Sequence, residues 1–168
     1  QATGAEGACL VEAIRHDLSA LARIRRGVER PPRVLFVLSF MNGRPLAAGR
    51  DTAADGIIRL AGAANAVDQY EGYKPLADEA VIAAQPDVVL AMERPGATLD
   101  AETVFAQAAF ALTPAARQKR FIAMDGLYLL GFGPRTARAA RDLAVALHAV
   151  GAAEPLPSET AGRVESCR

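Results

Sequence analysis

The sequence has few of the residues on which enzymes and metal sites commonly depend. Its 168 residues include two histidines, two cysteines and no tryptophan. No serine lies in a GxSxG motif, so the nucleophile elbow of many hydrolases is missing. Both histidines, His16 and His148, fall in segments that we expect to be helical, away from the loops where functional residues concentrate. The sequence therefore gives little support to a catalytic Ser/His or Cys/His pair, and we expect no catalysis.

An excess of charge of one sign is also missing, because 19 Lys and Arg are balanced by 19 Asp and Glu. Proteins that bind nucleic acid or another polyanion normally carry a basic surface. The basic side chains of TPAARQKR, residues 113–120, are most simply interpreted as a solvated face. No apolar run approaches the length of a transmembrane helix. We therefore expect neither a nucleic-acid partner nor a membrane span.

Cysteine is scarce, and the two cysteines lie near opposite ends of the chain, at Cys9 and Cys167. An oxidising compartment would allow a disulfide, but spacing alone cannot establish its geometry. Without a paired motif or a histidine cluster they make a poor metal site, and we expect them to be unpaired. The chain begins with Gln1 and carries no secretion signal, so we expect a processed or truncated piece of a longer protein.

The glycine pair in Gly131-Phe132-Gly133 is the stretch that most suggests a nucleotide site. A dinucleotide fingerprint needs GxGxxG, and position 136 is Thr. The sequence also has no GxxxxGK[ST] phosphate loop. A stand-alone α/β nucleotide-binding domain or enzyme stays open as an alternative of another class, and both missing motifs count against it.

Hydrophobic patterning predicts an α/β fold with a mainly parallel sheet and flanking helices, as in a Rossmann-like lobe. Apolar residues from Leu10 to Ile24 recur three and four positions apart and predict one long helix over residues 5–29. The continuous apolar run RVLFVLSF, residues 33–40, is typical of a strand covered on both faces. Further strands are predicted at 44–48, 65–67, 87–92 and 121–125, and further helices at 52–62, 75–85, 100–107 and 136–150.

Two predicted loops hold the side chains best suited to a ligand. The first reads YEGYKP, residues 70–75, and the second reads GLYLLGFGPR, residues 126–135. Together they contain all three tyrosines, and each has one cation, Lys74 or Arg135. Tyrosine and cationic side chains beside apolar ones suit a flat ligand that carries anionic groups. Core packing for Tyr128, and solvated charge for Lys74 and Arg135, stay open as the plainer interpretations.

Three long segments carry a family resemblance: RVLFVLSFMNGRPLAAGRDTAADGIIRLAGAANAVD, EGYKPLADEAVIAAQPDVVLAM and MDGLYLLGFGPRTARAARDLAVALH. They resemble the C-terminal lobe of haem-binding periplasmic substrate-binding proteins, a branch of the metal-chelate and cobalamin-type binding-protein family of ABC importers. The resemblance covers roughly residues 5–150. It implies an interlobe linker helix in residues 1–32, an α/β ligand-binding lobe in 33–150 and a flexible tail in 151–168. It also implies an N-terminal lobe that this chain lacks.

The resemblance further implies that haem is the transported ligand, in the periplasm, and that its iron is bound mainly by the lacking N-terminal lobe. Tyr73 and Lys74 in GYKPL, and Arg135 in GFGPR, match positions expected to contact the ligand. We predict that Tyr128 and Arg50 contact it as well. No histidine lies in either loop, which argues against a second imidazole ligand to the iron.

Two further expectations follow from the same resemblance. Glu79, in PLADEAV, matches the surface glutamate through which such proteins dock to the ABC permease. Ala77 stands where serine is usual, so the cap of that short helix should be weak. A siderophore or cobalamin in place of haem is the alternative ligand on the same fold.

Overall fold

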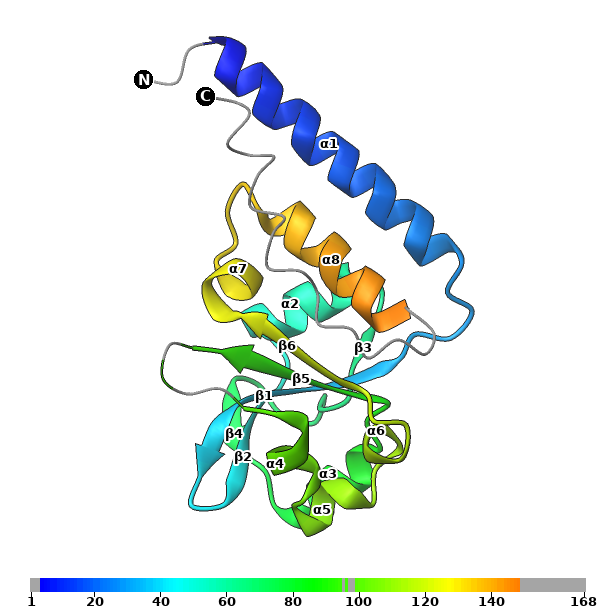
Figure 1. Cartoon of the computed structure of the whole chain (residues 1–168), viewed down its shortest axis with the longest axis vertical. Helices are drawn as coiled ribbons and strands as arrows, with labels where there is room; N and C mark the ends of the chain where they lie inside the picture. Colours follow the sequence, from blue (N-terminus) through cyan, green and yellow to red (C-terminus); the bar gives the residue numbers. More distant parts are fainter. Residues whose placement is uncertain (1–3, 95, 97–98, 149–168) are drawn as a thin grey trace.

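The structure, a computed structural model, describes residues 4–94, 96 and 99–148. It has three layers, with one sheet between two groups of helices (Figure 1). Helices α1, α2, α7 and α8 lie on one face of the sheet, and α3, α4, α5 and α6 lie on the other. The predicted α/β class is confirmed. The predicted tail, residues 151–168, lies outside the described residues.

In chain order the elements are α1 (Gly4–Arg26), β1 (Arg33–Met41), β2 (Arg44–Ala48), α2 (Ala53–Leu60), β3 (Ala64–Asn65), β4 (Tyr73–Pro75), α3 (Asp78–Ala84), β5 (Val88–Glu93), α4 (Ala101–Phe105), α5 (Ala108–Ala111), α6 (Pro114–Arg117), β6 (Phe121–Asp125), α7 (Gly126–Leu130) and α8 (Thr136–His148).

The sheet is mixed, with parallel strands at its centre. The strand order is β4-β2-β1-β5-β6, and the short β3 also pairs with β1. The pairs β1–β3, β1–β5 and β5–β6 are parallel, whereas β2 runs antiparallel to both β1 and β4. The hairpin between β1 and β2 turns at Asn42-Gly43, both with positive φ, as a two-residue turn requires. The apolar run 33–40 is therefore the central strand that its pattern predicts.

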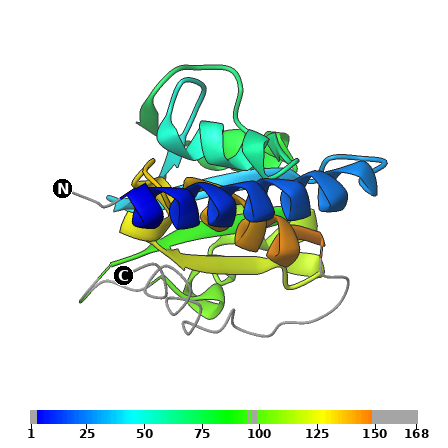
Figure 2. The same ribbon diagram turned by 90° about the horizontal axis from the view of Figure 1, so that it is seen from above.

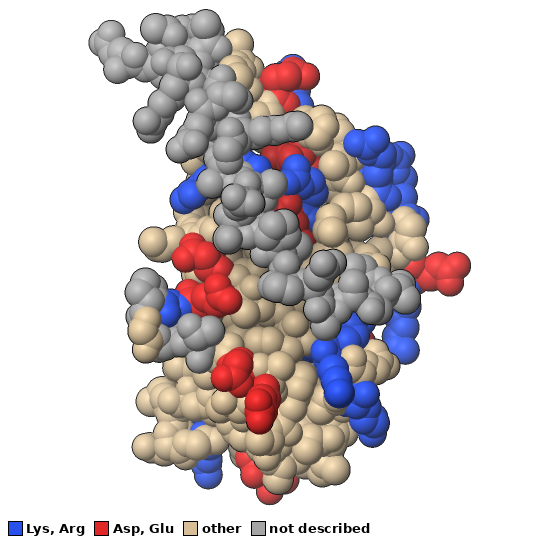
Figure 3. Space-filling model, in the orientation of Figure 1, with Lys and Arg blue, Asp and Glu red and all other residues tan. Residues whose placement is uncertain are grey.

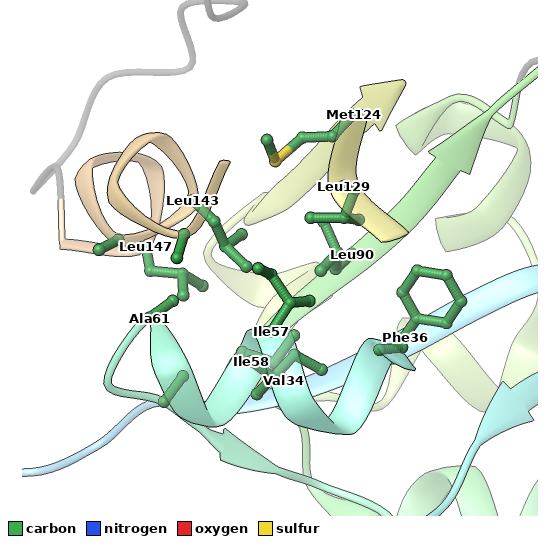
Figure 4. Packing of buried hydrophobic residues seen from close by; sticks show 14 of the residues in the cluster. Val34, Phe36, Ile57, Ile58, Ala61, Leu90, Met124, Leu129, Leu143 and Leu147 are labelled. Atoms are coloured by element: carbon green, nitrogen blue, oxygen red, sulfur yellow. The ribbon is translucent and has the colours of Figure 1, made fainter. Parts of the chain in front are cut away.

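Two hydrophobic clusters hold the layers together, one on each face of the sheet. In the first, side chains of α2, α7 and α8 converge with those of β1 and β5 (Figure 4). In the second, Phe110 of α5 is fully buried among residues of β1, β5 and α3. Alternate residues of β1 serve the two clusters, since Phe36 packs in the first and Val37 in the second. The core therefore fixes the sheet from both sides.

Helix α1 lies along α8 on the outside of the helical layer (Figures 1 and 2). It ends at Arg26, before the predicted position 29, in tight turns at Gly27 and Val28. Leu21 is buried and Ile24 packs on the core, but Leu18 is 44% exposed. The apolar stripe is thus used mainly in the second half of the helix. Cys9, near its start, is disulfide-bonded, so the expectation of an unpaired cysteine is wrong for this residue.

The predicted loop 126–135 begins as a helix instead. Strand β6 passes directly into α7, because the Asp125 carboxylate accepts a hydrogen bond from the Tyr128 backbone N–H at 2.7 Å and caps the first turn. Gly126 permits this sharp change, since a Cβ there would lie 2.4 Å from the sulfur of Met92. Tyr128 therefore lies on a helix, and the exposed loop is reduced to residues 131–135.

The short helix after the first loop also begins later than predicted. Pro75 pairs with Leu46 at the end of the edge strand β4, a position that tolerates a residue without an N–H. Helix α3 starts at Asp78, and its N-cap Ala77 makes no side-chain hydrogen bond, as expected. Gln85 ends α3 in the left-handed conformation, with φ of 43°.

The predicted helix 100–107 is the first of three short helices, α4, α5 and α6, so two helices were missed. Asp100 and Thr113 cap α4 and α6 through their side chains. At α2, Thr52 is the N-cap, and its hydroxyl oxygen accepts a hydrogen bond from the backbone N–H of Asp55. The Asp55 carboxylate accepts hydrogen bonds from Arg59 and from the buried Asn65.

Candidate functional site

The carboxyl ends of the parallel strands β1, β5 and β6 lie on one side of the sheet, at the left in Figure 1. Ligands of open α/β sheets bind outside this edge, because the loops that follow the strands meet there. The β1–β2 hairpin, residues 94–100 and α7 all follow these strand ends. The two segments singled out in the sequence, residues 70–75 and 126–135, can be described against this edge.

The first segment is held by backbone hydrogen bonds to residues 49 and 50. Gly49 N–H donates to Gly72 O at 2.8 Å. Arg50 N–H donates to Tyr70 O, and Gly72 N–H donates to Arg50 O. A Cβ at Gly49 would lie 2.3 Å from the carbonyl oxygen of Tyr70 and 2.5 Å from its ring. Glycine at position 49 is therefore what allows the Tyr70 backbone and ring to approach so closely.

Tyr70 uses its hydroxyl inside the protein. The hydroxyl lies 3.2 Å from Ala47 O and 3.3 Å from Lys74 O, and it can donate to either. Burial raises the pKa of Tyr70, so the phenol stays neutral. Lys74 Nζ lies 5.2 Å from the centroid of the Tyr70 ring, a cation–π contact. Within the described residues Lys74 has no carboxylate partner, which leaves its ammonium available to an anion.

Tyr73 and Arg50 differ in whether their polar groups already have partners among the described residues. Tyr73 is 37% exposed on the edge strand, with its ring 6.4 Å from that of Phe36 in an edge-to-face arrangement. No hydrogen bond between described residues involves its hydroxyl. Arg50 is exposed and its Nη2 lies 3.3 Å from Glu71 Oε1, so part of its charge is already balanced. Tyr73 therefore has the more available functional group.

Tyr128 is tied to helix α8. Its hydroxyl donates to Asp142 Oδ2 at 2.7 Å, and Asp142 Oδ1 accepts from Arg141 Nε at 2.9 Å and Nη2 at 2.6 Å. Arg141 also pairs with Asp17 of α1. Burial, the hydrogen bond to Asp142 and the charge of Asp142 together raise the pKa of Tyr128, although Arg138 and Arg141 oppose the shift. The Tyr128 phenol is therefore a neutral donor to a carboxylate.

Arg135 lies at the end of the exposed residues 131–135, directly before α8. Its Cζ is 5.9 Å from the centroid of the Tyr128 ring. In the described part of the chain it has no ion pair. A guanidinium at a helix N-terminus is unfavourable for the helix dipole, so an added anion would be stabilising there.

Helix α2 lies between the two segments. Its first residues follow Arg50, which bonds the first segment, and Gly56 in its first half lies under the Phe132 ring of the second. A Cβ at Gly56 would come within 3.3 Å of Phe132. The structure therefore connects the two segments through α2, and no hydrogen bond or ion pair between described residues joins them directly.

Apolar side chains are exposed at the same edge. Among the large hydrophobic residues that the structure describes, Leu127 is 80% exposed, Phe132 52% and Met41 49%. They belong to α7, the segment after it and the end of β1. Exposed apolar side chains near unpaired cations are what a flat amphipathic ligand needs. Leu127 and Phe132 lie in the predicted loop 126–135, whereas Asp142 and Arg141 could not be found from the sequence, since no motif links them to Tyr128.

Glu79 lies apart from this edge. It is exposed in the first turn of α3, on the opposite helical layer, beside Asp78. A carboxylate is favourable at this end of a helix. Within the described chain no ion pair involves Glu79, so its charge is available at the surface.

Other kinds of site find little support among the described residues. They contain no cluster of three or more His, Cys, Asp or Glu suited to a metal ion, and no helix long and apolar enough to cross a membrane. A hollow of about 200 Å³ beside Arg25 and Arg59 is smaller than the 300–1,000 Å³ of common ligand pockets. On the face that Figure 3 shows, acidic and basic side chains lie next to one another in the upper part, so the charges there do not form a patch of one sign.

Comparison with known proteins places the chain in a family. Residues 5–127 match the periplasmic binding protein family. The periplasmic heme-binding protein BhuT, solved in complex with two hemes, is 42% identical, with a TM-score of 0.77 over 84% of this chain and 55% of that one. RhuT from Roseiflexus sp. RS-1, a periplasmic heme-binding protein, is 39% identical, with a TM-score of 0.72 over 82% of this chain and 54% of that one.

HutB of Vibrio cholerae, another periplasmic heme-binding protein, is 33% identical, with a TM-score of 0.69 over 82% of this chain and 54% of that one. No curated protein sequence matches the chain. The chain spans about half the length of these solved structures. The family match covers most of the chain, including β1 to β6 and the first candidate segment, and it ends at Leu127, the second residue of the other segment. The chain therefore belongs to the periplasmic binding protein family.

Proposed function

We propose that the chain binds haem in the periplasm, as one lobe of a substrate-binding protein, and that the protein delivers the haem to an ABC importer. One observation carries the proposal. Lys74 and Arg135, two cations without carboxylate partners in the described chain, each lie over a tyrosine ring in the two segments, and the second segment also has exposed apolar side chains. The 42% identity to a heme-binding protein supports haem as the ligand.

Each group at the edge has a distinct task in this proposal. Lys74 and Arg135 bind the propionates, and Arg50 adds a weaker positive charge because Glu71 already pairs with it. Tyr73 and the exposed side chains Leu127 and Phe132 contact the porphyrin. Tyr128 contributes its ring. The main iron ligand comes from an N-terminal lobe outside this chain, and the protein binds and delivers without catalysing a reaction.

A siderophore or cobalamin is the second candidate ligand, because the periplasmic binding protein family match does not specify the ligand. Such a ligand would make less use of two cations aimed at a pair of carboxylates. Hemin and its dimethyl ester separate the candidates. They share the ring and the iron, and differ only in the charge of the propionates.

The test of the proposed function is Arg135→Ala in a two-lobed form of the protein. A partly desolvated charge-assisted hydrogen bond is worth roughly 1.5–3 kcal/mol, so hemin affinity should fall about ten- to a hundredfold. Arg135→Lys should recover only part of the loss, because an ammonium lacks the planar fork. Hemin dimethyl ester should bind the wild type and Arg135→Ala almost equally. A lower melting temperature with unchanged hemin affinity would make Arg135 a structural residue.

A single lobe should bind haem weakly, because a buried ligand needs two walls and this edge supplies one. Hemin titration of the 168-residue chain, beside a two-lobed form, measures the difference. Equal affinity in the two forms would contradict the assignment of the main iron ligand to another lobe.

Glu79 is proposed to dock the protein to the permease. Glu79→Gln should leave hemin affinity intact and lower hemin uptake in cells that carry the importer. Because a first-turn carboxylate stabilises a helix by about 0.3–1 kcal/mol, a small loss of stability is also expected. If Glu79→Gln lost hemin affinity while bound hemin was still taken up normally, the proposed docking role of Glu79 would be contradicted.

A further inference from the structure

We propose that Tyr128 is a positioning residue, whose ring holds the Arg135 guanidinium at the ligand edge and whose hydroxyl is anchored through Asp142 and Arg141 to helix α1. The inference rests on the proposed function, since it names how one cation of that site is placed. It assigns to Tyr128 a task other than binding the iron. The Tyr128 hydroxyl already donates a hydrogen bond within the protein.

The Tyr128 hydroxyl is fully engaged as a donor within the protein. It donates to Asp142 Oδ2 at 2.7 Å, and a phenol has only one hydrogen to give. To bind ferric iron it would have to lose that proton beside a carboxylate, in a half-buried site where burial and Asp142 both oppose ionisation. A phenolate ligand is therefore disfavoured, and the ring remains as the useful part.

The hydroxyl also fixes the ring to more than one element. Asp142 of α8 accepts from Tyr128 through one oxygen and from Arg141 through the other. Arg141 reaches in turn to Asp17 of α1, a residue 124 positions away in the sequence. Side chains of α7, α8 and α1 thus form one chain of charge-assisted bonds, which holds more firmly than neutral ones. The orientation of the Tyr128 ring is set by this chain.

The position of the Arg135 guanidinium depends on the Tyr128 ring, because few other interactions hold this side chain. Residues 131–135 are all exposed, and among the described residues the Arg135 guanidinium has no hydrogen bond or ion pair, whereas its Cζ lies 5.9 Å from the centroid of the Tyr128 ring. A long side chain held by nothing loses considerable rotamer freedom when it binds a ligand. A guanidinium already stacked on a fixed ring loses less, so a carboxylate-bearing ligand is bound more tightly.

The test is a double-mutant cycle with hemin as the probe, run in this chain and in a two-lobed form. Tyr128→Leu removes the ring and should weaken hemin binding about three- to tenfold. In the Arg135→Ala background the same change should have almost no effect, because the residue it positions is gone. Tyr128→Phe keeps the ring and loses the bond to Asp142 that fixes its orientation, so its hemin affinity should lie between those of Tyr128→Leu and the wild type. Hemin dimethyl ester should show little difference between Tyr128→Leu and the wild type.

A second measurement needs no ligand. In NMR spectra of the free chain, the side-chain protons of Arg135 should carry a ring-current shift that Tyr128→Leu abolishes and that Tyr128→Phe reduces, because the ring is then no longer fixed by Asp142. If hemin binds no variant, the proposed function fails, and the ring-current shift still decides whether Tyr128 holds Arg135. Additive losses in the cycle, or an unshifted Arg135 in the wild type, would overturn the inference. So would a tyrosinate-to-iron absorption band that disappears in Tyr128→Phe.

Discussion

Residues 70–75 and residues 126–135 each carry a cation over a tyrosine ring, yet the two segments are built differently. Lys74 lies over Tyr70 at 5.2 Å, and Arg135 lies over Tyr128 at 5.9 Å. The first segment is an edge strand held by backbone hydrogen bonds to residues 47–50. The second is a capped helix whose tyrosine is held by side chains of two other helices.

This difference teaches how each cation is fixed in space. Backbone pairing sets the first segment, so its geometry should survive many side-chain changes but not the loss of the close approach at Gly49. Side-chain bonds set the second, so single substitutions at Tyr128 or Asp142 should move it. The four predictions that follow test this contrast, in order of decreasing expected effect.

The largest effect is expected from a methyl group at Gly49. Gly49→Ala puts a Cβ within 2.3 Å of the Tyr70 carbonyl oxygen and should destabilise the fold by about 3 kcal/mol, at the upper end for overpacking. The matched control in the second segment is Gly133→Ala, where the nearest atom would be 3.9 Å away. Urea unfolding of both variants measures the difference. Equal stability of the two would mean that residues 70–75 are not held as described.

The two cations should differ in their contribution to hemin binding. Arg135→Ala should weaken binding more than Lys74→Ala, which should cost about three- to tenfold, because a guanidinium binds a carboxylate with two hydrogen bonds. Each change should alter stability by less than about 1 kcal/mol, as expected for an exposed cation–π contact. Hemin titration beside thermal unfolding separates the two effects. A larger loss at Lys74 would assign the stronger propionate contact to the first segment.

The hydroxyls of Tyr70 and Tyr128 should also contribute different amounts to stability. Tyr128→Phe removes a hydrogen bond to a carboxylate and should cost about 1–2 kcal/mol of stability, whereas Tyr70→Phe removes one to neutral carbonyls and should cost about 0.5–1 kcal/mol. Both variants keep the aromatic ring. Denaturant unfolding provides the comparison. A reversed order would show that the bond to Asp142 is not the stronger one.

The smallest effect is expected in alkaline solution. The pKa values of Tyr70 and Tyr128 are raised in the folded chain, by burial in both cases and by Asp142 as well for Tyr128. The unfolded protein therefore releases these protons first, above about pH 10. The stability that both phenols contribute is fully present below that pH and is lost as the pH rises further.

Tyr128→Phe should flatten the fall in stability above pH 10 more than Tyr70→Phe, because the Tyr128 shift has an additional cause. Urea unfolding midpoints measured between pH 8 and about pH 11 test this. An unchanged slope in Tyr128→Phe would indicate that the Tyr128 hydroxyl is not bonded to Asp142 in solution.

Patterning alone determined most of the fold. The strands 33–40, 44–48 and 121–125 were all predicted, because runs of apolar and strand-forming residues act locally. Lys74 and Arg135 were likewise singled out from the sequence, and their role in binding haem stays a prediction. Two of the predictions that failed, at Pro75 and at residues 126–130, concern positions where a neighbouring strand decides the geometry. Pro75 completes a pair with Leu46, and Gly126 fits under Met92.

The tertiary structure alone decided what each tyrosine does. The three tyrosines have different partners: Tyr70 bonds carbonyls of β2 and β4, Tyr128 bonds Asp142, and Tyr73 stays on the exposed edge. The disulfide at Cys9 was missed for the same reason, since no spacing rule specifies its geometry. Whether a phenol donates a hydrogen bond, contacts a cation through its ring or lies at the surface depends on the residues that pack beside it. That depends on contacts such as Asp17 with Arg141, made between residues 124 positions apart.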